Sequence, residues 1–263
     1  MTMSEKKSPE RDLAPALTRG LKILDGVASA GRSVTMTEIA EQLNVAKSSA
    51  HGLLSTLVSA GYLERLPNGK YRLGIRVVNL ANARLESSDL PAEFYAIWGQ
   101  HPEYRREAAI LAVLEEADVI YIACRNSPRP LGVTFRLGMR LPACCTATGK
   151  ALLSTLSNDE IRELYKKHEL VRLTQTSVPS VDKLLKQLDQ IRKQGFSVDD
   201  GETREHMWSA GAPIRAWEGQ RAEAAAAISF LRSDMTAKKA EKATTFVRQF
   251  ATALSSSRNA SAT

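Results

Sequence analysis

A Pro67-Asn68-Gly69 turn follows three short helical patterns and limits what the first part of the chain can form. Asn and Gly tolerate the positive φ of a tight hairpin, and this turn separates two strand-like runs, 62–66 and 70–73. Upstream, apolar residues recur at helical spacing over 14–30, and Gly31 supplies a stop. The order helix, helix, helix, hairpin predicts a three-helix domain with a β-hairpin wing.

The second and third helices have clear sequence signals. Thr35 is followed three residues later by Glu38, a capping box that predicts a short helix ending near Asn44. From about Ala46 to Ser59, apolar residues stack on one side and small polar residues occupy the other. A solvated helix face is the generic alternative, but the hairpin that follows favours a helix that packs by one face and reads the major groove with the other.

We predict a DNA-binding set centred on this third helix. Lys47 lies at its N-terminal edge, where backbone N–H groups favour a phosphate. Lys70 and Arg72 give the wing a basic edge that can follow the phosphate backbone, with ordinary surface charge as the alternative for either one. The predicted set is Arg19, Thr37, Lys47, Ser48, Ser49, His51, Gly52, Ser55, Lys70 and Arg72.

The remaining chain mixes strand-like and helical runs without strict alternation. This pattern predicts an α+β domain on an antiparallel sheet. The expected strands are 108–114, 119–124, 131–135, 196–199, 207–215 and 224–231, and the expected helices are 146–156, one capped by Ser157 and Glu160, 180–194 closed by Gly195, and 237–254. The predicted organisation is a disordered tail over 1–12, a winged helix-turn-helix over 13–74, a linker helix over 75–90, a second domain over 91–255 and a disordered tail over 256–263.

Composition and charge narrow the function class. The 263 residues carry a formal net charge of +7, which suits a polyanionic partner through long-range attraction and counterion release. The longest nearly apolar run, 224–231, is too short to span a bilayer, and the N-terminus lacks the apolar core of a signal peptide. We therefore expect a soluble cytoplasmic protein with no membrane partner.

Neither a metal site nor a known catalytic motif is indicated. Cys124, Cys144 and Cys145 have no C-x-x-C spacing, so we expect reduced thiols and no zinc or other metal, although a Cys144-Cys145 pair beside a helix start could sense oxidants. Thr148-Gly149-Lys150 lacks the first Gly and the final Ser or Thr of a phosphate-binding loop. No G-x-S-x-G, H-E-x-x-H or dinucleotide-binding fingerprint occurs, so we expect no enzyme and no cofactor.

The segment APALTRGLKILDGVASAGRSVTMTEIAEQLNVAKSSAHGLLSTLVSAGYLERLPNGKYRLGIRVVNLA resembles the DNA-binding domain of the IclR family of bacterial regulators. The family pattern of Pro, Lys, Ser, Thr, two further residues and Arg before paired leucines corresponds to 46–54. Ala46 replaces the Pro, and Gly52 replaces an Arg that family members commonly direct at DNA. Gly52 either allows close backbone approach or marks an altered operator preference.

The resemblance continues in LGMRLPACCTATGKALLS, LDQIRKQGFSVDDGE, SAGAPI and AAISFL. It implies a GAF-like α+β effector-binding domain whose site falls at Ala147, Thr148, Asp199, Ser209, Ser229 and Leu231. Thr146 can cap the following helix, and helix-start N–H groups suit a carboxylate, so we expect an acidic effector. His206, Met207 and Trp208 replace smaller residues and favour an aromatic or bulkier ligand, with a core or interface position as the alternative for Trp208.

The family resemblance implies a regulator that binds double-stranded operator DNA as a dimer formed through its N-terminal domains, with tetramers often formed through the C-terminal ones. We predict a repressor of a catabolic operon that responds to a small carboxylate or aromatic effector. The alternatives are an activator of an aromatic-degradation operon, a thiol-based redox regulator acting through Cys144 and Cys145, and a C-terminal domain that only oligomerises.

Overall fold

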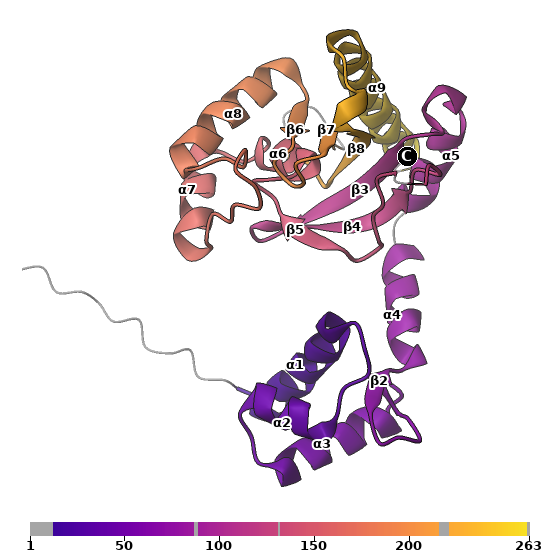
Figure 1. Cartoon of the computed structure of the whole chain (residues 1–263), viewed down its shortest axis with the longest axis vertical. Helices are drawn as coiled ribbons and strands as arrows, with labels where there is room; N and C mark the ends of the chain where they lie inside the picture. Colours follow the sequence, from indigo (N-terminus) through magenta and orange to yellow (C-terminus); the bar gives the residue numbers. More distant parts are fainter. Residues whose placement is uncertain (1–12, 87–88, 131, 216–220, 262–263) are drawn as a thin grey trace, which may run out of the picture. The chain divides into compact units, whose positions relative to one another are not determined.

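The computed structural model describes residues 13–86, 89–130, 132–215 and 221–261, which form two compact units divided between Ser87 and Ser88. The predicted tail over 1–12 lies outside the described residues. Each unit has its own buried core, and each is described by itself (Figure 1).

The N-terminal unit is a three-helix domain with a two-stranded wing and a following helix, as the sequence predicts. Its elements are α1 Pro15–Ala30, α2 Met36–Leu43, α3 Lys47–Ser59, β1 Leu63–Arg65, β2 Tyr71–Leu73 and α4 Ile75–Glu86. Gly31 ends α1 in the left-handed conformation, and Thr35 and Glu38 form the predicted capping box at the start of α2. Ile23, Leu54 and Tyr71 bring α1, α3 and the wing into one core.

The C-terminal unit is an antiparallel six-stranded sheet in the order β5-β4-β3-β8-β7-β6. Its strands are β3 Ala108–Glu115, β4 Asp118–Arg125, β5 Arg140–Pro142, β6 Ser197–Asp200, β7 Met207–Ile214 and β8 Ala224–Leu231. Its helices are α5 Leu90–Gly99, α6 Ala147–Leu153, α7 Asn158–Lys167, α8 Val181–Gln194 and α9 Ala237–Ser261, with short 3₁₀ turns at Pro102–Tyr104 and Arg232–Asp234. This is the predicted α+β class.

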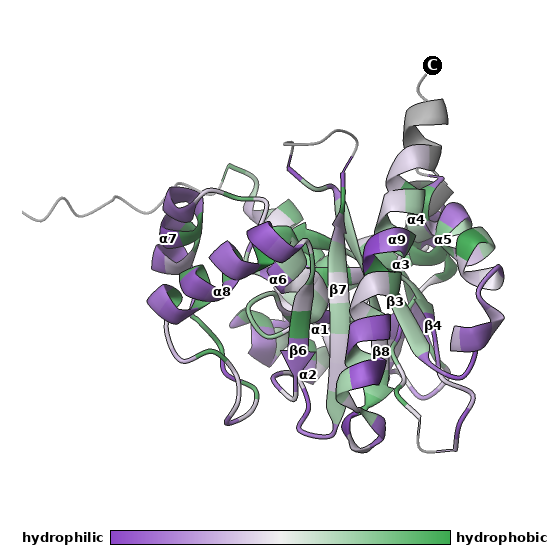
Figure 2. Cartoon of the chain, turned by 90° about the horizontal axis from the view of Figure 1, so that it is seen from above, coloured by the Kyte–Doolittle hydropathy of each residue, from purple (hydrophilic) through white to green (hydrophobic). Residues whose placement is uncertain are grey.

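The sheet is sandwiched between two helical layers. α6, α7 and α8 cover one face, and α5 and α9 cover the other (Figure 1). The central strands are apolar, whereas the outer faces of α7 and α8 are hydrophilic (Figure 2). Because successive strand residues point to opposite faces, alternate residues of β7 and β8 face the α6 layer.

Four sequence expectations need correction. The expected strand over 131–135 is absent from its described residues 132–135, because the Asn126 side chain, not a neighbouring strand, accepts the Phe135 N–H. α6 ends at Leu153, and the Ser154 and Thr155 hydroxyls then bond back to helix carbonyls before the cap at Ser157. The expected tail over 256–263 is helical as far as Ser261, since no Gly or Pro interrupts α9. The expected linker helix over 75–90 is α4, Ile75–Glu86, and Leu90 already belongs to α5. Neither α5 nor β5 was anticipated.

Candidate functional site

The exposed face of α3 gathers most of the predicted DNA-binding residues. Ala50 and Leu54 are fully buried and fix the helix against the domain. Consequently Lys47, Ser48, Ser49, His51, Gly52 and Ser55 all lie exposed on the other side. Ala46 gives α3 no side-chain cap, so solvent or a bound phosphate must satisfy its first amides.

The other predicted DNA-binding residues lie outside α3. Arg19 on α1 and Thr37 in the first turn of α2 are exposed, and Lys70 in the wing is half-buried. Arg72 pairs with Glu64 of the facing wing strand at 2.8 Å, so a neighbouring carboxylate partly neutralises its charge. The Asn68 side chain accepts the Lys70 N–H, and Gly69 has φ 77°, as the turn chemistry predicts.

Gly52 is not required by the packing of the domain. A Cβ built on it meets no heavy atom within 4 Å. The glycine therefore leaves an open stretch of backbone on the face that carries Ser49 and His51. The packing of this unit does not explain why a glycine stands at this position.

An apolar groove runs along the N-terminal unit. Leu17 and Leu21 of α1 are 64% and 53% exposed, although they share the helical spacing of buried residues. They line the groove with Leu24, Leu53, Leu57, Val77 and Leu80 from α1, α3 and α4. Leu80 is itself exposed, so this face presents apolar side chains that the unit does not bury.

The predicted effector residues come together on the α6 face of the C-terminal sheet. Asp199, Ser209 and Ser229 are cross-strand partners on β6, β7 and β8, and all three are buried. The Ser209 and Ser229 hydroxyls are 2.8 Å apart. Alternation with Met207, which packs in the α6 layer, places this polar row on the same face.

α6 lies close to this row because small residues line the contact. Gly149 packs against Ala143, and Gly211 lies against the Ala147 backbone, where an added Cβ would come within 2.8 Å. Ser197 donates to the Ala147 carbonyl at 2.5 Å. Thr146 caps α6 as predicted by accepting the Gly149 N–H, and Ala147 and Thr148 lie buried at the start of the helix.

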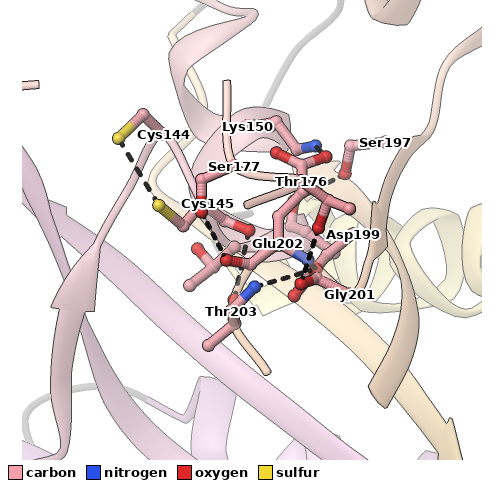
Figure 3. Close-up of polar contacts among 12 residues, drawn as sticks. Cys144, Cys145, Lys150, Thr176, Ser177, Ser197, Asp199, Gly201, Glu202 and Thr203 are labelled. Carbon is pink, nitrogen blue, oxygen red and sulfur yellow. Dashed lines mark hydrogen bonds and ion pairs between the residues drawn. The ribbon is translucent and has the colours of Figure 1, made fainter. Parts of the chain in front are cut away.

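A buried charged cluster adjoins the row (Figure 3). Lys150 of α6 and Glu202, both almost fully buried, form a short ion pair. Asp199 accepts N–H bonds from Glu202 at 2.6 Å and Thr203 at 3.1 Å through Oδ1. Within the described structure, Asp199 Oδ2 and Glu202 Oε2 are buried without a hydrogen-bond partner.

Burial shapes the acid–base properties of this cluster. It raises the pKa of the Asp199 carboxyl, although hydrogen bonds from Thr203 and the charge of Lys150 oppose the shift. Burial also raises the pKa of Glu202 against the opposing charge of Lys150. Two desolvated carboxyls with unpartnered oxygens can accept donors from a ligand or hold a proton.

A segment between α7 and α8 crosses this cluster and covers the cysteine pair. We call it the strap, residues 169–180. Thr174, Thr176 and Ser177 donate to the carbonyls of Gly201 and Glu202 at 2.7–3.2 Å. Beneath it the Cys144 and Cys145 sulfurs are 3.8 Å apart, and both bond to the Val171 carbonyl.

Of the three residues expected to favour an aromatic or bulkier ligand, His206, Met207 and Trp208, only Met207 packs on the α6 face of the sheet. Trp208 lies on the opposite sheet face, where it is buried under α9 with Phe230 at a ring distance of 6.0 Å. This is the core alternative, and it removes Trp208 from the argument for an aromatic ligand. His206 is exposed in the turn before β7, whereas Met207 and the partly buried Leu231 pack in the α6 layer.

Sequence reasoning did not assign Lys150, Glu202 or Tyr121 to the site. Lys150 was considered only as part of a phosphate-binding loop, and Glu202 follows Asp199 in the same turn. Tyr121 of β4 is buried in the α6 layer and packs edge-on against Phe135. Burial raises the pKa of its phenol, and the charge of Asp199 adds to this effect.

Two further observations concern the described residues as a whole. They contain no group of three or more His, Cys, Asp or Glu side chains placed to hold a metal ion. No helix in this part of the chain is long and apolar enough to cross a membrane.

A wing beside an exposed helix face, and a sheet domain with a buried polar row, define a transcription regulator with a ligand-binding domain. The IclR helix-turn-helix domain model matches residues 16–67, and the bacterial transcriptional regulator IclR C-terminal model matches residues 100–256. The chain belongs to the IclR family of DNA-binding transcription regulators with an effector-binding C-terminal domain. Members of this family are not enzymes.

Named relatives include both repressors and an activator. The crystal structure of the Agrobacterium tumefaciens repressor BlcR is 40% identical, with a TM-score of 0.61, and the match covers 94% of this chain and 98% of that one. The acetate operon repressor of Salmonella typhimurium is 31% identical, covering 74% of this chain and 72% of the relative. The p-hydroxybenzoate hydroxylase transcriptional activator of Acinetobacter baylyi is 26% identical, and the match covers 82% of this chain and 81% of the relative.

Proposed function

We propose that the chain represses a catabolic operon and that a small organic acid, bound at the polar row of the C-terminal unit, changes its affinity for operator DNA. The observation that carries the effector site is the buried row of Asp199, Ser209 and Ser229 beside Thr148. In this row Asp199 Oδ2 is buried without a hydrogen-bond partner, and such an acceptor is costly unless a ligand or a water molecule satisfies it. Ala147 and Leu231 complete the proposed site.

On the DNA side, we assign base reading to Ser49, His51 and Ser55, with Ser48 and the open backbone of Gly52 beside them. Lys47, Lys70 and Arg72 contact phosphates. Arg19 and Thr37 flank the helix and position it. These roles follow from exposure and residue type: small polar side chains at the groove and cations at its edges.

A dimer is part of this proposal. The groove lined by Leu17, Leu21 and Leu80 leaves apolar surface that a second copy of the unit can cover. Two-fold protein symmetry then matches a pseudo-palindromic operator with two half-sites. Pairing of the C-terminal units would give a tetramer. We assign residues 13–74 to DNA binding, 75–90 to the linker and 91–255 to effector binding and oligomerisation.

Activation of an aromatic-degradation operon is the second candidate. The relative from Acinetobacter baylyi is named a transcriptional activator, whereas BlcR and the acetate operon regulator are named repressors. We favour repression because the two named repressors are more similar to this chain, at 40% and 31% identity, than the activator at 26%. A transcription assay from the chain's own promoter decides the sign: repression predicts more transcript without the protein.

The cysteine pair supports a third candidate, a thiol-based sensor. A hydrogen bond from Cys144 lowers the pKa of the Cys145 thiol, but both side chains are at most 1% exposed. Buried thiols react slowly, so we expect the half-buried Cys124 to be alkylated first. Faster alkylation of Cys145, with loss of DNA binding that an effector does not reproduce, would favour the sensor.

The test of the proposed function is a fluorescence-anisotropy titration of the full chain against DNA from its own upstream region. It is repeated with a panel of small aliphatic and aromatic acids. We expect tight, salt-sensitive binding that one class of acid alters and an unrelated sequence does not reproduce. Equal affinity for both DNAs, with no effect of any acid, would contradict the proposal.

A further inference from the structure

The charged cluster at the effector site leaves little positive charge for an anion. Lys150 is committed to Glu202 in a buried ion pair. With all three groups ionised, Asp199 gives the cluster two carboxylates to one ammonium. A carboxylate ligand beside Thr148 and Asp199 would therefore meet a net repulsion in a poorly screened environment. A further cation beside the cluster would offset this repulsion.

Arg204 lies in the turn between β6 and β7, a few residues after Asp199. Its guanidinium carbon lies 5.8 Å from the ring centre of Phe135, which packs edge-on to Tyr121 at 5.4 Å. Both rings belong to the buried layer between the sheet and α6. The aromatic face orders the guanidinium group without neutralising it.

Electrostatics connect Arg204 with the effector residues. Burial raises the pKa of the Tyr121 phenol, the carboxylate of Asp199 raises it further, and Arg204 and a hydrogen bond with Thr148 oppose the shift. The backbone gives a direct link as well, because Arg204 follows Thr203, whose N–H donates to Asp199 Oδ1 at 3.1 Å. Arg204 therefore lies next in the chain to a residue that contacts Asp199, and its guanidinium group lies over the Phe135 ring beside Tyr121.

Two nearby arginines, Arg129 and Arg232, are already paired. Arg232 pairs with Asp200 at 2.7 Å, and Arg129 forms ion pairs with Glu107 and Asp234. Arg204, by contrast, makes no ion pair and no side-chain hydrogen bond with any residue in the described ranges. The Arg204 side chain is half-buried, so its guanidinium N–H groups are partly desolvated and can donate hydrogen bonds to a ligand.

We propose that Arg204 binds the anionic group of the effector and makes the site select carboxylates over their uncharged analogues. This inference rests on the proposed function, because it names the charge partner within the same site. A guanidinium group pairs with a carboxylate through two parallel hydrogen bonds. Arg204 is thus a specificity-determining residue whose charge offsets the excess of carboxylate in the cluster.

The test compares acids with their amides on four full-length proteins: wild type, Arg204→Gln, Arg204→Lys and Arg136→Gln. Arg136 is an exposed arginine beside Phe135, so its variant makes the same change in net charge outside the site. The probes are acetate, propionate, butyrate and benzoate, each with its primary amide, measured by isothermal titration calorimetry.

We expect Arg204→Gln to weaken binding of the acids about ten- to a hundredfold and to leave the amides nearly unchanged. Arg204→Lys should recover part of the loss, and Arg136→Gln should match wild type. The role of Arg204 is overturned if wild type binds an acid and Arg204→Gln binds it equally, or if both glutamine variants lose affinity alike. Failure of wild type to bind any acid would overturn the proposed effector class as well.

Discussion

Replacing Lys150 with Met should strongly destabilise the C-terminal unit. The Lys150 side chain is 2% exposed and its partner Glu202 is 9% exposed, so the variant leaves a buried carboxylate without its ammonium. Asp199 adds a second buried carboxyl nearby, and each acid already has an unpartnered oxygen. Removing one partner of a buried pair costs about 3–5 kcal/mol. With a urea slope of about 2 kcal/mol per M, the midpoint should fall by about 1.5–2.5 M.

The assay is urea denaturation followed by tryptophan fluorescence. All three tryptophans of the sequence lie after residue 88, so the signal reports the C-terminal unit in the full chain. Lys186→Met, at an exposed position of α8, is the matched control and should change stability by less than about 0.5 kcal/mol. The double variant Lys150→Met/Glu202→Gln should be less destabilised than Lys150→Met. A loss below about 1 kcal/mol for Lys150→Met would refute this account of the pair.

Three further predictions follow from the structure. Gly52→Ala should stabilise α3 by about 1 kcal/mol, because the added Cβ meets no atom and alanine favours the helix. Hydrogen exchange of the α3 amides measures this, and faster exchange in the variant would contradict it. Glu64→Gln should break the ion pair with Arg72 and strengthen binding to DNA of any sequence. The slope of log binding constant against log salt concentration should become steeper by up to about 0.9. An unchanged slope would show that Arg72 contacts no phosphate. Burial raises the pKa of Asp199 in the folded state, so above about pH 4 the native chain binds more protons at this group than the unfolded chain does. The stabilisation from this group is therefore lost as the pH rises from about 4 through the folded-state pKa. The stability of Asp199→Asn relative to wild type should therefore increase from pH 4 to pH 7, and a pH-independent difference would contradict the sign.

Local signals predicted the N-terminal unit well because its chemistry is local. The capping box at Thr35 and the Pro67-Asn68-Gly69 turn each act within four residues, and both occur as predicted. The same holds for α8, which begins at the Ser180 cap and ends at Gly195 in the left-handed conformation. Such signals need no knowledge of the tertiary fold.

The misses arise where distant segments decide the structure. Phe94 and Trp98 of α5 pack against Phe250 of α9, and their spacing was available in the sequence as an unused helical signal. The segment 132–135 has strand-like residues, yet the Asn126 side chain satisfies its backbone in place of a neighbouring strand. No local pattern reveals such a substitution.

The candidate effector site shows the same limit. The resemblance gave Asp199, Ser209 and Ser229, and the strand register brings them into one buried row. The pairing of Lys150 with Glu202 joins residues far apart in the chain, and the sheet face on which Trp208 lies follows from strand alternation. No local pattern gives the Lys150–Glu202 pair, whereas the opposite face of Trp208 could have been inferred from its place next to Ser209 in the predicted strand.

In the proposed mechanism the C-terminal unit controls DNA binding through a ligand. The most direct measurement is reciprocal: the affinity of the acid that binds is determined by calorimetry with and without saturating operator DNA, and the affinity for that DNA is determined with and without the acid. We expect the two ratios to be equal and to differ from one, typically by about 5- to 150-fold. If the acid binds but both ratios equal one, the C-terminal unit binds a ligand without regulating the DNA-binding unit, and ligand control of DNA binding is ruled out for that acid.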